Sequence, residues 1–210
     1  MKKVLFILVK FVYSLFSWIN SNASRTNIFY CIRNKIFSLW MSQRFNCRKC
    51  SFGYPISFRC GSQFFKIADG CTFGKHSIIT AWETYREYKY TPSVTIGNNC
   101  VFGNYLHLTC CNKIVIGKNL LTGKWVTISD NSHGQIDEET MKYPPTERPL
   151  YSKGPIVIGD NVWIGDKVTI LAGVEIGDNS IIGANSVVTK SIPANVIAAG
   201  IPARIIKQIV

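Results

Sequence analysis

An aliphatic residue recurs every six positions along most of the chain between Ile67 and Val188. Gly or another small residue usually follows it, and Asn, Asp or Lys comes next, as in the unit IGDNVW at 158–163. A period of six with one aliphatic anchor fits neither an α-helix nor a half-buried strand. It fits a parallel β-helix, in which each unit is a short strand and a turn. We therefore predict an all-β domain, a parallel β-helix, over residues 67–210.

The anchors group in threes, which predicts about five triangular coils. They are Ile67, Phe73, Ile79, Ile96, Phe102, Leu108, Ile116, Thr122, Ile128, Ile158, Ile164, Ile170, Ile176, Ile182 and Val188. The fifth position of a unit also points inward, where only small or β-branched side chains fit. It carries Cys71, Cys100, Val162, Val168, Val174, Ser180 and Ser186. Each strand buries its anchor only against neighbouring coils, so the array stabilises itself cooperatively.

Interruptions of the repeat come only after a third unit. One lies between Ile79 and Ile96, a short one precedes Ile116, and a long excursion spans 134–157. The chain re-enters the repeat each time with an aliphatic residue two positions before the next anchor, namely Val94, Ile114 and Ile156. Insertions should therefore leave the prism at one corner, and insertions on one side of a repeat structure commonly carry the binding site.

The charge of the chain is concentrated in residues 1–66. The net charge is +12 over 210 residues, yet this first third holds eleven Lys or Arg and no Asp or Glu. We predict a separate basic, apolar, helical segment here. Because its cations are spaced through apolar sequence, an anionic membrane surface is favoured as its partner over nucleic acid. The alternative is a helical cap on the end of the β-helix, with its charges solvated.

Two apolar stretches make up this segment. Residues 4–19 are too short and too interrupted by Lys10 to span a bilayer, and the small residues at 21–23 leave a signal peptide as an alternative. Residues 27–41 place Ile28, Ile32 and Ile36 on one helical face. The eight cysteines include one C-x-x-C pair, Cys47 and Cys50, but no second pair at zinc spacing, so the zinc signal is weak. Cys71 and Cys100 fall on the inward fifth position and are expected to be reduced core residues, which fits the cytosol. We expect a cytoplasmic protein held peripherally at the inner face of the cell membrane.

Residues 156–207 resemble the C-terminal half of galactoside and maltose O-acetyltransferases, which are hexapeptide-repeat acyltransferases. The elements V-T-K-x-I-P at 188–193 and A-G-x-P-A-R at 199–204 make the resemblance specific. It is looser over 94–133 and absent from the first 65 or so residues. The resemblance implies a left-handed β-helix, a homotrimer with active sites between subunits, and acetyl-CoA as donor.

By this resemblance the chain transfers an acetyl group to a sugar hydroxyl, and our leading hypothesis is capsular or O-antigen polysaccharide biosynthesis. An N-acetyltransferase of an amino sugar nucleotide is the alternative enzyme. A non-enzymatic β-helical scaffold is the other alternative, although it leaves Thr189-Lys190 and 200–204 unexplained. The sequence leaves the identity of the acceptor open.

His133 ends the third coil, directly before the long excursion. In the resembled family a His at this point is the general base. A sugar hydroxyl is a poor nucleophile, and a neutral imidazole is well suited to accept its proton near neutral pH. We therefore predict that His133 is catalytic, with Asp130 and His107 as candidate contacts of the acceptor.

The resemblance also assigns residues to coenzyme A: Trp163, Asp166, Ala184, Thr189, Lys190, Arg204 and Lys207. Small Ala184 would let the pantetheine arm approach the backbone, and the cations would meet the phosphates. Asp166 stands where the galactoside enzyme has Ser, so only its backbone contact is expected. The three histidines fall on different positions of their coils, and we predict no metal site.

Overall fold

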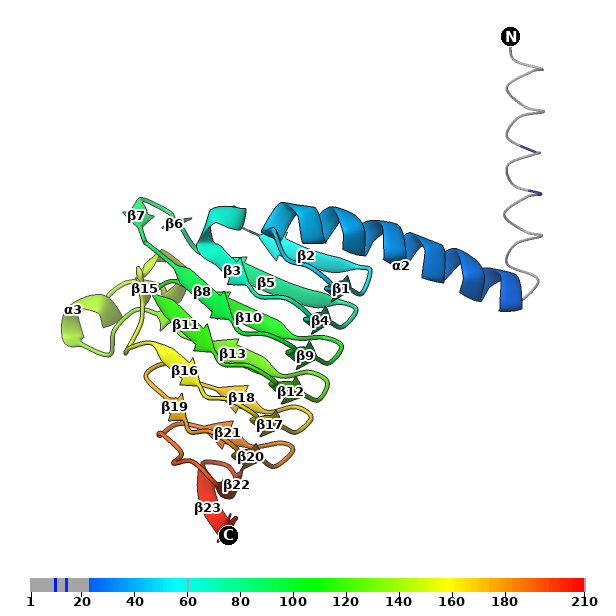
Figure 1. The fold of residues 1–210 in the computed structure, drawn as a ribbon. Coiled ribbons are helices and arrows are strands. Elements are labelled where there is room, and N and C mark those ends of the chain that lie inside the picture. The colour runs from blue at the N-terminus through cyan, green and yellow to red at the C-terminus, as the bar shows by residue number, and fades with distance from the viewer. Residues whose placement is uncertain (1–9, 11–13, 15–22, 60, 210) are drawn as a thin grey trace.

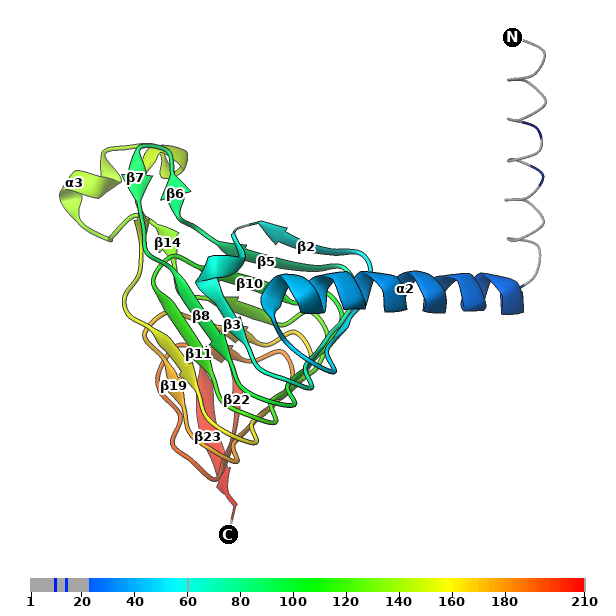
Figure 2. The same ribbon diagram turned by 45° about the horizontal axis from the view of Figure 1, so that its top comes forward.

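The structure is a computed structural model, and it describes residues 10, 14, 23–59 and 61–209. The predicted helix over 4–19 and most of the 21–23 cleavage signal therefore lie outside the described residues. Three sheets form the walls of a triangular prism, and their strand pairs are parallel except for the last pair of one sheet (Figures 1 and 2). We name them sheets A, B and C in the order in which the chain visits them.

Sheet A contains β1 (Ser51–Phe52), β4 (Thr72–Phe73), β9 (Val101–Phe102), β12 (Leu121–Thr122), β17 (Trp163–Ile164), β20 (Ile181–Ile182), β22 (Val196–Gly200) and β23 (Ala203–Gln208). Sheet B contains β2 (Ile56–Arg59), β5 (Ser77–Ala81), β10 (His107–Cys110), β13 (Thr127–Ser129), β18 (Thr169–Ile170) and β21 (Val187–Val188). Sheet C contains β3 (Phe65–Ile67), β8 (Ser93–Ile96), β11 (Lys113–Ile116), β16 (Ile156–Ile158) and β19 (Glu175–Ile176). The turns between the sheets make three corners, A–B, B–C and C–A.

The register of the sheets places equivalent anchors on top of one another. On sheet C, for example, Ile116 pairs with Ile96 on one side and Ile158 on the other. All the predicted anchors are buried, and so are the predicted fifth-position residues. The predicted parallel β-helix and its repeat units are confirmed. The parallel coils fit the left-handed β-helix that the family resemblance implies.

The β-helix begins earlier than predicted. Strand β1 pairs in parallel with β4, and β2 pairs in parallel with β5, so Ser51–Arg59 already forms two sides of a coil. Phe52 is fully buried and stacks on Phe73 at 5.0 Å between ring centroids. The boundary between 66 and 67 is therefore corrected to about residue 51. An aromatic anchor and an irregular spacing concealed this coil.

Helix α2 (Ala23–Phe45) lies across the N-terminal end of the prism (Figure 2). The Ser38 hydroxyl accepts a hydrogen bond from the Phe52 backbone amide at 2.8 Å, and Met41 and Phe45 are buried. The predicted helix at 27–41 is thus part of a longer one, and its C-terminal half caps the β-helix. Within the described ranges, no helix is both long and apolar enough to cross a bilayer.

Both long insertions leave the prism at the B–C corner, as predicted. The first forms the hairpin of β6 (Thr84–Tyr85) and β7 (Tyr88–Lys89). The second begins with β14 (Ser132–His133), which pairs antiparallel with β15 (Leu150–Tyr151). The remaining short elements are η1 (Ser62–Phe64), α3 (Glu138–Met141) and η2 (Pro145–Glu147). Figure 1 shows the two insertions side by side at one edge of the prism.

Candidate active site

His133 is exposed at the point where the second insertion leaves sheet B. It lies on β14, opposite Leu150 of β15, immediately beyond β13. The next residue, Gly134, is buried at φ +90°, and an added Cβ would lie 2.5 Å from the Thr140 side chain. A side chain therefore has no room there, and the glycine lets α3 pack close behind His133.

The first insertion supplies the ring beside His133. Tyr85 meets the His133 ring edge to face, with ring centroids 5.4 Å apart. Trp82 packs edge-on against Tyr85, and its indole N–H donates to the Thr109 hydroxyl at 2.9 Å. Asn131 donates to the same hydroxyl at 3.2 Å. The imidazole is therefore set against a packed aromatic and polar support drawn from both insertions.

Asp130 is fully buried, which corrects its predicted contact with the acceptor. One carboxylate oxygen accepts from the Cys111 amide at 2.8 Å and from the Asn131 side chain at 3.0 Å. The other accepts from the Asn112 amide at 2.9 Å and from the Cys110 thiol at 3.2 Å. Four donors satisfy its two oxygens, so Asp130 holds the B–C corner together instead of facing a substrate.

The two cysteines around Asp130 remain protonated thiols. Burial, followed by the neighbouring Asp130 carboxylate, raises the pKa of the Cys111 thiol to about 12 and raises the pKa of the Cys110 thiol still further. A protonated Cys110 is the species that donates to Asp130. These residues are buried structural thiols.

A polar hollow of about 450 Å³ lies between the hairpin and the second insertion. Its lining comprises Arg86, Glu87, Tyr88, Glu139, Thr140, Tyr143, Glu147 and Pro149. The hairpin is tied to the insertion where Tyr85 and Arg86 both donate to the Thr146 carbonyl, at 3.0 and 2.6 Å. Tyr85 therefore connects the wall of the hollow to the His133 ring.

Two of the predicted coenzyme A residues lie in one row across sheet A. The register pairs Trp163 with Ile181, then Ile181 with Ile197, and Ile197 with Lys207. Trp163 and Lys207 are exposed. Three strand spacings separate them, or about 14 Å.

Three more predicted residues, Asp166, Ala184 and Arg204, lie along the A–B corner. The backbone amide of Asn185, next to Ala184, donates to the Asp166 carbonyl at 2.8 Å, so Asp166 and Ala184 are stacked in adjacent coils. Ala199 lies against Gly183 and pairs with Arg204, which brings Arg204 to the same edge. The Asp166 carboxylate accepts from the Lys124 amide at 2.7 Å, so this side chain is occupied within the corner.

Thr189 and Lys190 lie at the B–C corner, directly after β21. Strands β13, β18 and β21 are neighbours on sheet B, so Lys190 leaves the prism two coils below His133. The width of sheet B separates these residues from the A–B corner. Within one protomer, the predicted residues therefore form two groups on different edges, with His133, Thr189 and Lys190 on one edge.

His107 begins β10 at the A–B end of sheet B, whereas His133 lies beyond the B–C end. The structure therefore does not bring His107 to His133 within a protomer, and the contact of His107 with the acceptor stays a prediction. His76 stacks on Tyr105 at the A–B corner, with ring centroids 5.0 Å apart. Among the residues that the structure describes, no three His, Cys, Asp or Glu side chains cluster as metal ligands.

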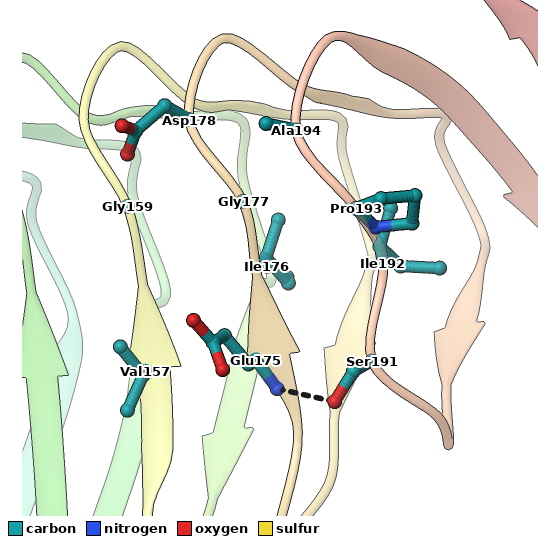
Figure 3. Close-up of a pocket in the computed structure, with 10 residues that line it drawn as sticks. All are labelled: Val157, Gly159, Glu175, Ile176, Gly177, Asp178, Ser191, Ile192, Pro193 and Ala194. Carbon is teal, nitrogen blue, oxygen red and sulfur yellow. Dashed lines mark hydrogen bonds between the residues drawn. The ribbon is translucent and has the colours of Figure 1, made fainter.

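Figure 3 shows a further hollow, of about 550 Å³, over sheet C. Glu175 and Asp178 line it, together with Ser191 to Ala194, and no described lining residue is basic. The Glu175 amide donates to the Ser191 hydroxyl at 3.0 Å. Two carboxylates without a cation make this hollow unsuited to the phosphates of a nucleotide, and none of the predicted site residues lines it.

Sequence reasoning missed the residues that support and surround His133: Trp82, Tyr85, Arg86, Thr109 and Asn131. The break between Ile79 and Ile96 was recognised as an insertion but was not assigned to the site. Its composition, WETYREYKY at 82–90, is rich in aromatic and charged residues. Together with its exit from the same corner as the long excursion, this composition was the available signal.

The fold is a parallel β-helix of six-residue units, with a histidine where its long insertion begins. Residues 155–190 match the family described as bacterial transferase hexapeptide (six repeats). The chain is 43% identical to the galactoside O-acetyltransferase of Escherichia coli K12 over 122 residues, which are 58% of this chain and 57% of that protein. The resemblance to hexapeptide-repeat acyltransferases is thereby confirmed.

Two further proteins extend the comparison. The chain is 38% identical over 119 residues to the putative lipopolysaccharide biosynthesis O-acetyl transferase WbbJ of Escherichia coli K12, or 55% of this chain and 60% of that one. The hexapeptide-repeat-containing acetyltransferase VCA0836 of Vibrio cholerae superposes with a TM-score of 0.51 at 25% identity, over 80% of this chain and 77% of the other. The chain spans less than two thirds of the length of each of the two Escherichia coli relatives.

Proposed function

We propose that the protein is an O-acetyltransferase that moves an acetyl group from acetyl-CoA to a sugar hydroxyl, in capsular or O-antigen polysaccharide biosynthesis. The observation that carries the proposal is His133, an exposed imidazole backed by Tyr85 at the corner from which both insertions leave. The names of the galactoside enzyme and WbbJ support both the reaction and the kind of acceptor.

The chemistry needs one base and one polarised thioester. The acceptor hydroxyl attacks the carbonyl carbon of acetyl-CoA, and His133 takes the hydroxyl proton as the C–O bond forms. The tetrahedral intermediate then collapses, the C–S bond breaks, and the imidazolium returns the proton to the leaving thiolate. The products are the acetyl ester and free coenzyme A, so no other reactant is required.

The two separated groups of residues support a homotrimer with its sites between subunits. One protomer would supply His133, Thr189 and Lys190 from its B–C corner. Its neighbour would supply Trp163 and Lys207 from the face of sheet A, and Ala184 and Arg204 from its A–B corner. Contacts between two different edges are heterologous, and three such contacts can close into a cyclic trimer.

Complementation tests this arrangement. His133→Ala and Trp163→Ala should each be nearly inactive alone. When the two are unfolded and reassembled together in equal amounts, about one site in four should combine an intact His133 with an intact Trp163 from the neighbour. Recovery of activity supports the shared site. Both residues acting within one protomer would give no recovery.

The polar hollow beside Tyr85 is our candidate for the acceptor sugar. It presents the three carboxylates Glu87, Glu139 and Glu147, while Arg86 is engaged by the Thr146 carbonyl. Lys142 pairs with Glu139 at 2.8 Å. Such a lining favours a neutral or amino sugar over a uronic or sialic acid, because like charges repel.

A thiol-release assay with acetyl-CoA tests reaction and acceptor together. The panel should hold matched neutral sugars, amino sugars and sugar acids, and mass spectrometry should locate the acetyl group on oxygen or nitrogen. We expect O-acetylation of a neutral sugar, with sugar acids as the poorest acceptors. Acetylation of nitrogen alone would overturn the O-acetyltransferase, and a preferred sugar acid would overturn the assigned hollow.

We propose that the protein is located peripherally at the inner face of the cell membrane. The eleven basic and no acidic residues of 1–66 support it, since an anionic lipid surface attracts such a segment. Acetyl-CoA is made in the cytosol, which places the donor on that side. Cell fractionation at low and high salt would test whether the protein leaves the membrane as charges are screened.

A further inference from the structure

Helix α2 has two apolar faces on opposite sides. The inner face, with Ser38, Met41 and Phe45, packs on β1 and on the aromatic cluster at the end of the prism. At about 100° per residue, a second apolar stripe lies about 180° from the first. Its exposed residues are Ile28, Phe29, Ile32, Ile36, Leu39 and Trp40. We call this set the outer face of α2.

The outer face is too apolar to be an ordinary helix surface. Ile36 is 64% exposed, Leu39 66% and Trp40 55%, although such residues are normally buried when they adjoin one another. A shallow apolar groove runs along it, lined by Phe29, Ile32, Arg33, Ile36, Phe37, Trp40 and Tyr54. Figures 1 and 2 both show α2 projecting past the edge of the coils, so the rest of the described chain leaves this face uncovered.

Cations border the outer face on both sides. Counted around the helix, Arg33 and Arg44 fall along one margin of the stripe and Lys35 along the other. The helix has four basic residues and no acidic one. The Arg33 guanidinium lies 4.7 Å from the Tyr30 ring and 4.3 Å from the Tyr54 ring, which holds it beside the groove.

We infer that the outer face of α2 is a docking surface for an anionic lipid bilayer. An apolar stripe bordered by cations is the pattern of a helix that lies in the membrane interface, with its apolar side chains among the acyl chains and its cations at the phosphates. The charge argues against a second copy as the occupant. Two outer faces brought together would place cations on cations, with no carboxylate in residues 1–66 to offset them.

Docking through this face sets the orientation of the enzyme, and this part of the inference rests on the proposed function. Because the inner face of α2 caps the first coil, the outer face points away from the prism, and the coils extend from the membrane into solvent. On sheet B, β13 lies three strands beyond β2, or about 14 Å. His133 would thus stand clear of the lipid and open to a water-exposed glycan.

Vesicle flotation of the full chain tests the docking surface. Vesicles of phosphatidylcholine alone are compared with vesicles containing phosphatidylglycerol. We expect flotation with the anionic vesicles only. Ile36→Ser and Leu39→Ser should each lower the partition coefficient about tenfold, and Arg33→Gln and Lys35→Gln about fivefold each. Ile136→Ser is the matched control, since Ile136 is 94% exposed on the second insertion and should have no effect.

Trp40 provides a direct readout of insertion. Brominated acyl chains should quench its fluorescence, and Trp40→Phe should remove that part of the quenching. Wild-type flotation by the Ile36 and Leu39 variants, or unchanged quenching in Trp40→Phe, would overturn the inference. A change of oligomeric state in these variants with flotation intact would instead identify the face as a contact between copies. Thiol release with a soluble acceptor should stay unchanged in every variant, so a failure of docking is distinguishable from a failure of the proposed acetyl transfer.

Discussion

The C–A and B–C corners of the β-helix use the same coils in opposite ways. At the C–A corner, every turn from the second coil onward carries an Asn at positive φ, and the side chains form a ladder. Asn119 donates to Asn161 at 2.8 Å, Asn161 to Asn179 at 3.0 Å, and Asn179 to Asn195 at 3.1 Å. The described B–C corner has no such ladder, and both insertions leave from it.

The difference shows how a repeat protein can combine regularity with a site. Stability comes from stacking between neighbouring coils, so two regular corners keep the strands in register while the third is interrupted. The insertions then need their own anchors, and Asp130 and Tyr90 supply them. The Tyr90 hydroxyl accepts from the Leu150 amide at 2.7 Å, joining the two insertions at their bases.

The A–B corner is intermediate, since it is regular but built from other residues. Its non-glycine positive-φ positions hold His76, Tyr105, Trp125, Lys167 and Asn185. The Tyr105 and Trp125 rings stack at 4.8 Å, and the Lys167 ammonium lies 6.0 Å from the Trp125 ring. Bulky residues are uncommon in this conformation, so we attribute their presence to the stacking energy that offsets the strain.

Removing the proposed base, His133, at the interrupted corner should have the largest effect. His133→Ala should lower turnover about 10²–10⁴-fold, because a positioned base contributes that much to proton transfer. The melting temperature should stay unchanged, since the side chain is exposed outside the core. Steady-state kinetics with saturating acceptor and a thermal melt check both parts. Near-normal turnover would remove His133 from the mechanism.

Asp130→Asn should destabilise the protein by about 2–4 kcal/mol. The amide replaces one acceptor oxygen by a donor, and every group around Asp130 is itself a donor. Asp160→Asn is the matched control. Its oxygen accepts from the Lys118 amide at 2.8 Å at the C–A corner, and an Asn oxygen can keep that bond. Equal denaturant midpoints for the two variants would show that Asp130 does not hold the corner.

Breaking the Asn ladder at the regular C–A corner should destabilise the protein less. Asn161→Ala loses one donated and one accepted hydrogen bond and places a Cβ-bearing aliphatic residue at φ +57°, so we expect a loss of about 1–2 kcal/mol. Asn161→Gly separates the loss of hydrogen bonds from the backbone strain, because glycine tolerates the conformation but makes no side-chain bonds. Turnover below the melting transition should be normal for both. An altered turnover would mean that this corner also serves the site.

The smallest effect is expected at the A–B corner. Trp125→Asn loses the stacking with Tyr105 but relieves a bulky residue at φ +56°, so the stability should change by less than about 1 kcal/mol. Tyr105→Asn, which breaks a ring stacked on both sides, should cost more. Chemical denaturation of the pair compares them. A larger loss of stability in Trp125→Asn than in Tyr105→Asn would show that stacking energy does not offset the backbone strain.

The sequence alone determined the parallel β-helix, its units, and the corner at which the insertions leave. These three features follow from local sequence, because the residues of each six-residue unit determine which side chain points inward and which turn follows. The resemblance at 188–193 and 199–204 added the prediction of an acyltransferase. The role of His133 was predicted from the resemblance together with its position at the end of a unit, before an interruption, and it stays a prediction.

Only the tertiary structure decided how residues far apart in sequence meet. The Phe45 and Phe58 rings, 4.7 Å apart, belong to a cap and first coil that carry no six-residue signal. Asp130 was a candidate contact of the acceptor, yet it is buried against the preceding coil and accepts hydrogen bonds there. Tyr85 reaches His133 only because two insertions leave from stacked coils. Periodicity specifies which side of a strand is buried, but contacts between insertions depend on packing that no repeat encodes.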